Sequence, residues 1–441
     1  MYRLVLPKHL VLLLQLKSKS RPLPKVVGTQ RTVAPEETFR RAYAEACALG
    51  MTRLGDITGM DRLGIPTYCA IVPKSRDVIS VYTGKGIDRI DAKVGALMEA
   101  IERQTALRAQ LPIVIGSVND LRRDHEVLDP SETTLELLPD YSEAREYSWV
   151  LGHELLSQCA VLVPAEMAGY LWENLLPGPF VPFSSTNGLA SGNIIEEAIF
   201  QALCELIERD AWTLADIGAH LIPWTRRRLV EPETVDSGED DFEMFQSLEL
   251  ENDRVLELFE SAGLRPVVHD ITSDIGIPTV FAAVLDDAFP DLPMIHAGLG
   301  THPNAHVAVR RALTEAAQSR CVDIQGVRED LCPADADQTA FNTHTSRISA
   351  VNHKVWTINH SRVRKKVSAL PSAVYDDVQE DLDHILSRLE QFGIRQVIVV
   401  DLTPDGAPYS VVRVIVPGLE TWSVNHARLG KRALEFWRTH V

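Results

Sequence analysis

Two stretches of the sequence that repeat each other decide the fold of this protein. Residues 86–103, GIDRIDAKVGALMEAIER, align without a gap with residues 192–209, GNIIEEAIFQALCELIER. A weaker third copy runs through Gly300, Ala308, Ala312, Leu313, Glu315 and Gln318. Each copy begins at a glycine and continues with helical periodicity, and such self-similarity indicates internal duplication. We therefore predict a pseudo-threefold repeat of strand–glycine loop–helix units.

A second match supports duplication. TGMDRLGIPT at residues 58–67 leads into the first unit, and TSDIGIPT at residues 272–279 leads into the third. The alternative explanation is that ExxER reflects only the helix propensity and solvation of Glu and Arg. Because the repeated positions also include small and apolar residues, the match favours duplication.

Around these units, the apolar pattern predicts an α+β fold. Expected helices cover 35–49, 91–107, 195–218 and 306–320, and expected strands cover 66–73, 278–285, 294–298, 395–402 and 409–416. Residues 186–192 are expected to form a polar loop. The expected parts of the chain are a flexible leader at 1–25, an N-terminal segment at 26–80, a main domain at 81–420 with a mobile acidic insertion at about 231–245, and a C-terminal helix and tail at 421–441.

Composition narrows the class of protein. A formal net charge of −17 would repel the phosphate backbone of nucleic acid. The 6 cysteines form no CxxC pair, which disfavours a disulfide framework and a zinc site. The apolar run at residues 9–16 is too short to span a bilayer. We predict a cytoplasmic protein with neither a membrane nor a nucleic-acid partner.

Acidic and amide side chains share one helix face in each copy. They are Glu99 and Glu102 in the first copy, Glu197, Gln201, Glu205 and Glu208 in the second, and Glu315 and Gln318 in the third. Carboxylates that are buried together repel one another unless a cation is bound. Oxygen ligands without His or Cys favour Mg²⁺, which also binds substrate phosphates, and neighbouring arginines suit phosphate oxygens. The sequence therefore predicts a Mg-nucleotide pocket, although it contains no GxxxxGK[ST] loop.

At these residues the sequence resembles the YcaO superfamily, in its stand-alone form associated with TfuA proteins. The resemblance extends over roughly residues 58–420 and includes ALMEAIER, SSTNGLASG, ALCELIERDA, TSDIGIPT, GLGTHPN and RALTEAAQSR. It implies a YcaO-type fold of mixed and antiparallel sheets packed on long helices, with the catalytic domain at 81–420. It also implies a homodimer and an enzyme that uses ATP and Mg²⁺ to phosphorylate a peptide-bond oxygen.

Position by position, the resemblance implies roles for individual residues. The implied catalytic residues are Arg103, Arg209 and Arg311, and the implied metal ligands are Glu99, Glu102, Glu197, Glu205 and Glu208. The implied nucleotide contacts are Lys85, Glu99, Asn193, Gln201, Arg209, Arg311, Glu315, Gln318, Arg31 and Thr38. Gly95 and Ala190 stand where family members often have serine, and Ser191 lies beside the second position.

The leading hypothesis is thioamide formation in a ribosomally made peptide or protein, with sulfur delivered by a TfuA-like partner. Phosphorylation makes the amide oxygen a good leaving group, so that sulfide gives a thioamide and a neighbouring Cys, Ser or Thr gives an azoline. An azoline-forming cyclodehydratase is the alternative, disfavoured because the chain ends in FWRTHV rather than in a PxPxP tail. Two further alternatives are a non-catalytic accessory protein for ribosomal-protein methylthiolation and an interaction protein whose glutamates are salt-bridged.

Overall fold

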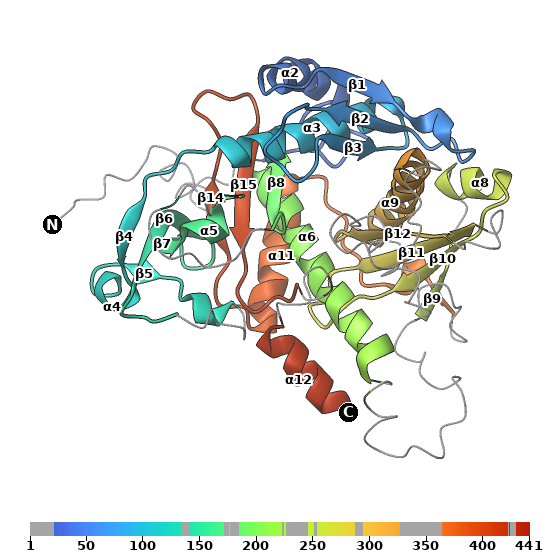
Figure 1. Cartoon of the computed structure of the whole chain (residues 1–441). Coiled ribbons are helices and arrows are strands. Elements are labelled where there is room, and N and C mark those ends of the chain that lie inside the picture. The colour runs from blue at the N-terminus through green and yellow to red at the C-terminus, as the bar shows by residue number, and fades with distance from the viewer. Residues whose placement is uncertain are drawn as a thin grey trace, which may run out of the picture.

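The computed structural model describes residues 22–133, 141–171, 176, 185–222, 225, 246–250, 254–286, 294–326, 364–421, 423 and 429–441. The acidic insertion predicted at 231–245 and residues 1–21 of the predicted leader lie outside this set. The described strands form sheets of three, five and seven strands with long helices packed on them, so the α+β prediction is confirmed (Figure 1). No described helix combines the length and the apolar character that a membrane-crossing segment needs.

The N-terminal unit places a helix on a small antiparallel sheet. It comprises α2 (Pro35–Ala48), β1 (Arg53–Asp56), β2 (Thr67–Ile71), β3 (Val81–Lys85) and α3 (Arg89–Arg108), with the strands in the order β1-β2-β3. Gly84 of β3 lies against α3, where a Cβ atom would stand only 2.1 Å from the backbone nitrogen of Ala96. Any side chain at this position would push the helix away from the strand, so Gly84 sets the close packing of β3 on α3.

A second unit repeats this relation. It contains β9 (Gln246–Glu249), α8 (Arg254–Ser261), β10 (Pro266–Asp270), β11 (Thr279–Asp286), β12 (Met294–Thr301), α9 (Ala305–Gly326) and β13 (Arg364–Lys366). The sheet order is β12-β11-β10-β9-β13, and β13 runs parallel to β9. A Cβ atom on Gly298 of β12 would stand 2.2 Å from the backbone nitrogen of Ala316 on α9, which is the relation that Gly84 has to Ala96.

The seven-stranded sheet has the order β5-β7-β6-β14-β15-β8, with β4 paired to β6. Its strands are β4 (Val114–Ser117), β5 (Glu126–Val127), β6 (Glu146–Glu154), β7 (Cys159–Pro164), β8 (Leu189–Gly192), β14 (Ile398–Asp401) and β15 (Ser410–Ile415), and two short helices, α4 (Val118–Leu121) and α5 (Ala165–Ala168), lie between them in the chain. Alternation along β14 and β15 buries Val399 and Val412 against α6 (Ile195–Asp216) and α11 (Val378–Phe392). Ile398 and Val400 instead join the core that contains α3.

The prediction of a loop over residues 186–192 is wrong in its second half. Residues 189–192 form β8, which pairs antiparallel with β15. This short strand is Leu-Ala-Ser-Gly, fully buried, and it packs on α6. Small residues permit that close packing, but they carry little of the β-branched signal by which a strand is predicted.

The three sheets share one hairpin turn. The amide of Thr58, Thr272 or Thr403 donates to an aspartate two residues earlier at 2.9–3.0 Å, and the threonine hydroxyl accepts from the backbone across the turn at 3.0–3.1 Å. The first two turns belong to the predicted repeat, and the third follows β14. These shared bonds support the predicted pseudo-threefold relation, which stays a prediction.

The C-terminal helix α12 (Lys431–His440) is attached to α6, which continues into a π-helical turn (Ile217–Leu221). Arg432 of α12 pairs with the fully buried Asp210 of α6 at 2.9 Å, and it also pairs with Asp274. Asp210 is the neighbour of Arg209 in the chain, so this contact anchors α12 to the C-terminal part of α6, next to Arg209.

Candidate active site

The predicted site lies between α3, α6 and α9. Each helix contacts the strand that precedes the next one: α3 contacts β8, α6 contacts β12, and α9 contacts β3 (Figure 1). Because the glutamates follow the helix faces that turn toward this junction, side chains more than two hundred residues apart in the chain come together.

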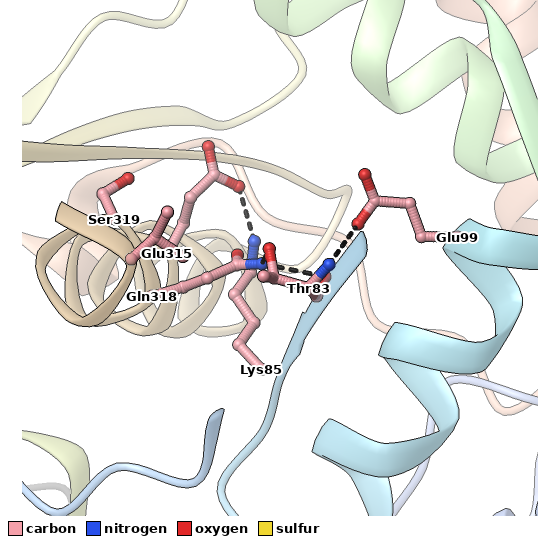
Figure 2. Close-up of a pocket in the computed structure, with 7 residues that line it drawn as sticks. Thr83, Lys85, Glu99, Glu315, Gln318 and Ser319 are labelled. Carbon is pink, nitrogen blue, oxygen red and sulfur yellow. Dashed lines mark hydrogen bonds and ion pairs between the residues drawn. The ribbon is translucent and has the colours of Figure 1, made fainter. Parts of the chain in front are cut away.

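A cavity of about 290 Å³ opens at the junction of β3, α3 and α9. Figure 2 shows its polar lining, which comprises Thr83, Lys85, Glu99, Glu315, Gln318 and Ser319. The Lys85 ammonium pairs with Glu315 at 2.6 Å. The Gln318 amide donates to the Thr83 hydroxyl at 2.7 Å, and the backbone amide of Thr83 donates to Glu99 at 3.1 Å. These bonds hold three elements around one polar space.

The carboxylates of α3 and α6 are poorly neutralised. Arg209 approaches Glu205 at 3.9 Å and Glu208 at 3.7 Å, which is too far for hydrogen bonds. Burial, reinforced by the charge of Glu315, raises the pKa of Glu208 to about 7, although Arg209 acts in the opposite direction. Burial also raises the pKa of Glu205. Burial therefore disfavours the ionised forms of these groups, and a bound cation would favour them.

Glu102 and Glu315 differ in how they are compensated. Burial and the charges of Glu205 and Glu99 raise the pKa of Glu102 well above its usual value. Burial acts in the same direction on Glu315, but Lys85 and Arg209 outweigh it and lower its pKa. A cation bound near Glu102 would offset both its burial and the charges of Glu205 and Glu99.

Glu197 is bound very differently at the N-terminal end of α6. One carboxylate oxygen accepts from the Thr32 amide and hydroxyl, both at 2.7 Å. The other accepts from the backbone and side-chain amides of Asn193, both at 2.9 Å. The Thr38 hydroxyl in turn donates to the Asn193 carbonyl oxygen at 2.8 Å. Glu197 thus fastens residues 22–34, here called the N-terminal strap, and the start of α2 to the site.

Two further predicted arginines, Arg311 and Arg31, link the Glu197 end of α6 to the rest of the site. Arg311 of α9 donates to Gln201 of α6 at 2.9 Å. Arg31 is partly buried close to Glu197 and Arg311, and desolvation lowers its pKa. His302 accepts from the Asn304 amide at 2.9 Å, and burial lowers its pKa well below its usual value, so it is a neutral residue that supports the loop before α9.

The side chains present fit a Mg-nucleotide. Within the described residues, no three His, Cys, Asp or Glu side chains stand close enough to hold a metal ion by themselves. Mg²⁺ needs only one or two carboxylates, because waters and substrate phosphates complete its shell. Glu99, Glu102, Glu205 and Glu208 would supply those carboxylates. The buried Nε of Arg209 finds no hydrogen-bond partner among the described residues, and a phosphate oxygen would satisfy it.

This fold and this donor set define an α+β protein that holds a nucleotide through Mg²⁺ without a P-loop. The YcaO family model, described as a YcaO cyclodehydratase that binds ATP and Mg²⁺, matches residues 83–420. The chain belongs to the YcaO family, whose members are ATP-dependent enzymes. The predicted resemblance is confirmed, and so are ATP and Mg²⁺ at the level of the family.

Related proteins agree with this assignment. The chain is 36% identical over 406 residues to an uncharacterized protein of Methanothermobacter thermautotrophicus, which covers 91% of this chain and 98% of that protein. It is 32% identical over 415 residues to an uncharacterized protein from the tfuA 3′ region of Rhizobium leguminosarum bv. trifolii, covering 92% of each. The structure of YcaO from Methanopyrus kandleri bound with AMPPCP and Mg²⁺ is similar, with a TM-score of 0.69, 25% identity, and coverage of 93% of this chain and 98% of that one.

A heterocyclase solved in complex with its substrate and cofactor has the same fold. Its TM-score is 0.69 at 20% identity, and the match covers 91% of this chain and 54% of that one.

Sequence reasoning missed several residues that shape the site. Thr83 precedes Lys85 by two positions, so the alternation of a strand could have placed both on one face. Asp77 and Tyr170, which contact Arg103, are 93 residues apart and belong to no repeated motif. Only the packing of the N-terminal unit against the seven-stranded sheet brings these two residues together.

Proposed function

We propose that this chain uses ATP and Mg²⁺ to phosphorylate a backbone amide oxygen in a ribosomally made peptide or protein, and that sulfide then replaces this oxygen. The observation that carries the proposal is the cluster of poorly neutralised carboxylates on α3 and α6 beside partly buried arginines. In a family that binds ATP and Mg²⁺, such a cluster would hold Mg²⁺ together with the phosphates of the nucleotide.

The reaction is balanced by phosphate release. The amide oxygen takes the γ-phosphoryl group as the bond to ADP breaks, and sulfide adds to the amide carbon. The carbon–oxygen bond then breaks, the oxygen leaves as part of inorganic phosphate, and a proton is lost as the thioamide forms. An amide resists such substitution without activation, because oxide is a poor leaving group.

The chain's own cations would stabilise this transfer. Lys85, Arg103, Arg209 and Arg311 surround the carboxylates and would neutralise the charge that spreads over the moving phosphoryl group. Glu99, Glu102, Glu205 and Glu208 would position the metal. The proposal also includes Glu197 as a fifth ligand, with Arg31 and Thr38 as nucleotide contacts. This part of the proposal requires the strap to rearrange, because Thr32 and Asn193 occupy the Glu197 carboxylate.

Thioamide formation is preferred because of one relative. The Rhizobium protein from the tfuA 3′ region supports a TfuA-like partner that delivers sulfur. The family's description as a cyclodehydratase supports the second candidate, in which a Cys, Ser or Thr side chain of the substrate attacks instead and gives an azoline. A cytoplasmic location and a homodimer remain part of the same proposal.

Mass spectrometry of a substrate peptide separates these products. The purified chain would be incubated with ATP, Mg²⁺, sulfide and the TfuA-like protein, with omission of sulfide as the control. We expect a mass gain equal to the exchange of oxygen for sulfur, together with release of ADP and phosphate. Loss of water would establish the azoline reaction. Modification that proceeds without any ATP consumption by this chain would show an accessory role instead.

A further inference from the structure

Arg103 is held by two residues from outside the repeated motifs. Tyr170 follows α5, and its hydroxyl accepts from the Arg103 guanidinium at 3.1 Å while donating to Asp77 at 2.6 Å. Asp77 lies between β2 and β3 and also contacts Arg103 directly at 3.5 Å. The Arg103 guanidinium carbon lies 5.7 Å from the centroid of the Tyr170 ring.

The group is rigid because Asp77 is itself fully bound. Its side chain is 0% exposed, and its second carboxylate oxygen accepts from the Tyr82 hydroxyl at 3.0 Å. Gln104, the residue after Arg103, donates to the same Tyr82 hydroxyl at 2.8 Å. Burial and the bond to Asp77 raise the pKa of Tyr170, which therefore stays a neutral donor.

Asp77 and Tyr170 hold the positive charge of Arg103 beside the carboxylates. Its charge lowers the pKa of Glu99 and Glu102 on α3 and of Glu205 on α6, against the larger effect of burial. The guanidinium stays 3.9 Å from Glu99, beyond hydrogen-bond distance. If Tyr170 and Asp77 released it, Arg103 would be free to close onto Glu99 and compete there with a metal ion.

We propose that Asp77 and Tyr170 are positioning residues, which hold the Arg103 guanidinium away from Glu99 so that it faces the phosphates while Glu99 stays available to Mg²⁺. This inference rests on the proposed function. Arg103 is the group that contacts the nucleotide, and the two positioning residues act only through it. Tyr170 comes from the seven-stranded sheet region, so the contact also ties the β1–β3 unit to the rest of the site.

The molecule contains a matched control outside the site. Tyr68 donates to Asp56 at 2.8 Å and accepts from Arg89 at 3.1 Å, so the same three residue types make the same bonds. The Arg89 side chain is 64% exposed, compared with 16% for Arg103. Tyr68→Phe therefore removes an equivalent hydroxyl without touching the carboxylate cluster.

A double-mutant cycle tests the inference. Wild type, Tyr170→Phe, Arg103→Ala and the double variant would be compared in Mg-ATP turnover and in calorimetric binding of Mg-AMPPCP, at several Mg²⁺ concentrations. Tyr170→Phe should weaken turnover about tenfold and raise the Mg²⁺ requirement, and it should have no further effect when Arg103 is already alanine. Tyr68→Phe should leave both readouts unchanged, and melting curves would verify that both phenylalanine variants are folded at the assay temperature.

The outcomes are distinguishable. An equal loss from Tyr170→Phe in both backgrounds would show that the tyrosine acts independently of Arg103, and no loss in either would remove its role; both results overturn the inference. Wild-type protein that binds Mg-AMPPCP but modifies no amide would overturn the proposed reaction alone, since the cycle can still be measured by binding. Wild-type protein that does not bind Mg-AMPPCP at all would overturn both.

Discussion

The two ends of the polar face of α6 treat their carboxylates in opposite ways. Glu197, at the N-terminal end, is 0% exposed, and its oxygens accept four hydrogen bonds from Thr32 and Asn193. Glu208, three turns further on, is almost as buried at 4% exposure, but its nearest cation, on Arg209, remains 3.7 Å away. A glutamate is thus fully hydrogen-bonded by the protein at one end of the helix, whereas at the other end a glutamate lacks a close cation.

This difference separates a carboxylate that the protein itself satisfies from one that stays available to a metal ion. A buried charge is stable when several donors surround it, and costly when it is not compensated. Selection for stability alone would have compensated Glu208 as it compensated Glu197. We therefore propose that the metal ion binds at the uncompensated end of the helix.

The largest expected effect comes from removing Glu208. Glu208→Ala should reduce Mg-ATP turnover by about 10²–10³-fold, the usual loss when one group that stabilises transition-state charge is removed. The metal-free variant should be as stable as wild type or more stable, because an unfavourable buried charge is gone. Steady-state kinetics and urea unfolding would measure both. Turnover that survives this substitution would refute the metal site.

Glu197→Ala should give the reverse stability result. Four donors on Thr32 and Asn193 would lose their acceptor, so we expect the free energy of unfolding to fall by about 3 kcal/mol. Urea unfolding of the metal-free protein measures this loss, and Glu205→Gln serves as the control. If Glu205→Gln lowered the free energy of unfolding as much as Glu197→Ala, the proposed distinction between the two ends of α6 would be wrong.

Binding of Mg-ATP should stabilise the folded protein through the uncompensated carboxylates at the Glu208 end of α6. Mg-ATP at a hundred times its dissociation constant should add about 2.7 kcal/mol to the free energy of unfolding. Thermal melts with Mg-ATP, with ATP plus EDTA and with Mg²⁺ alone would isolate the contribution of the complex. Glu208→Ala should lose this shift. A wild-type protein whose melting temperature ignores Mg-ATP would count against the site.

The pH dependence of stability should have the sign set by Glu208. Its pKa rises from 4.5 to about 7 in the folded protein, so the folded state holds the extra proton between these values. Between about pH 5 and pH 7 Glu208 should therefore make the metal-free protein lose stability as pH rises, by at most about 1.4 kcal/mol per pH unit. Glu102 and Glu205, whose pKa values are also raised, add to the slope with the same sign. Glu208→Gln should remove its own share of this slope, and saturating Mg-ATP should reduce the slope further. A slope that is unchanged in Glu208→Gln would assign the proton to another group.

Much of the fold could be predicted because the repeat carries strong helical periodicity. The predicted helix at 195–218 corresponds to α6, Ile195–Asp216, and the hairpin at 395–416 corresponds to β14 and β15. β8 was missed because its small buried residues give no strand signal. The residues of the repeated helices were predicted as the site, and the structure brings their side chains to one junction.

The parts that escaped prediction depend on contacts between distant segments. Thr32 binds Glu197 across 165 residues, and Gln318 binds Thr83 across 235 residues. Neither contact follows from spacing along one helix or strand. The sequence also predicts Glu197 and Glu208 as equivalent ligands, since both lie on one face of α6. Only the structure distinguishes them, because two of the four donors for Glu197 come from Thr32 of the strap.

The smallest expected effect concerns Thr38. It tests whether the hydrogen-bonded network around Glu197, at the N-terminal end of α6, extends to α2. The Thr38 hydroxyl on α2 donates to the Asn193 carbonyl oxygen, which orients the Asn193 amide toward Glu197. Thr38→Val keeps the shape and removes this bond, so the free energy of unfolding should fall by about 1 kcal/mol. Thr52→Val, at an exposed hydroxyl with a 3.4 Å bond to the Ile71 carbonyl, is the control. If Thr38→Val instead lowers Mg-ATP affinity with unchanged stability, the hydroxyl contacts the nucleotide, and the satisfied end of α6 belongs to the binding site as well.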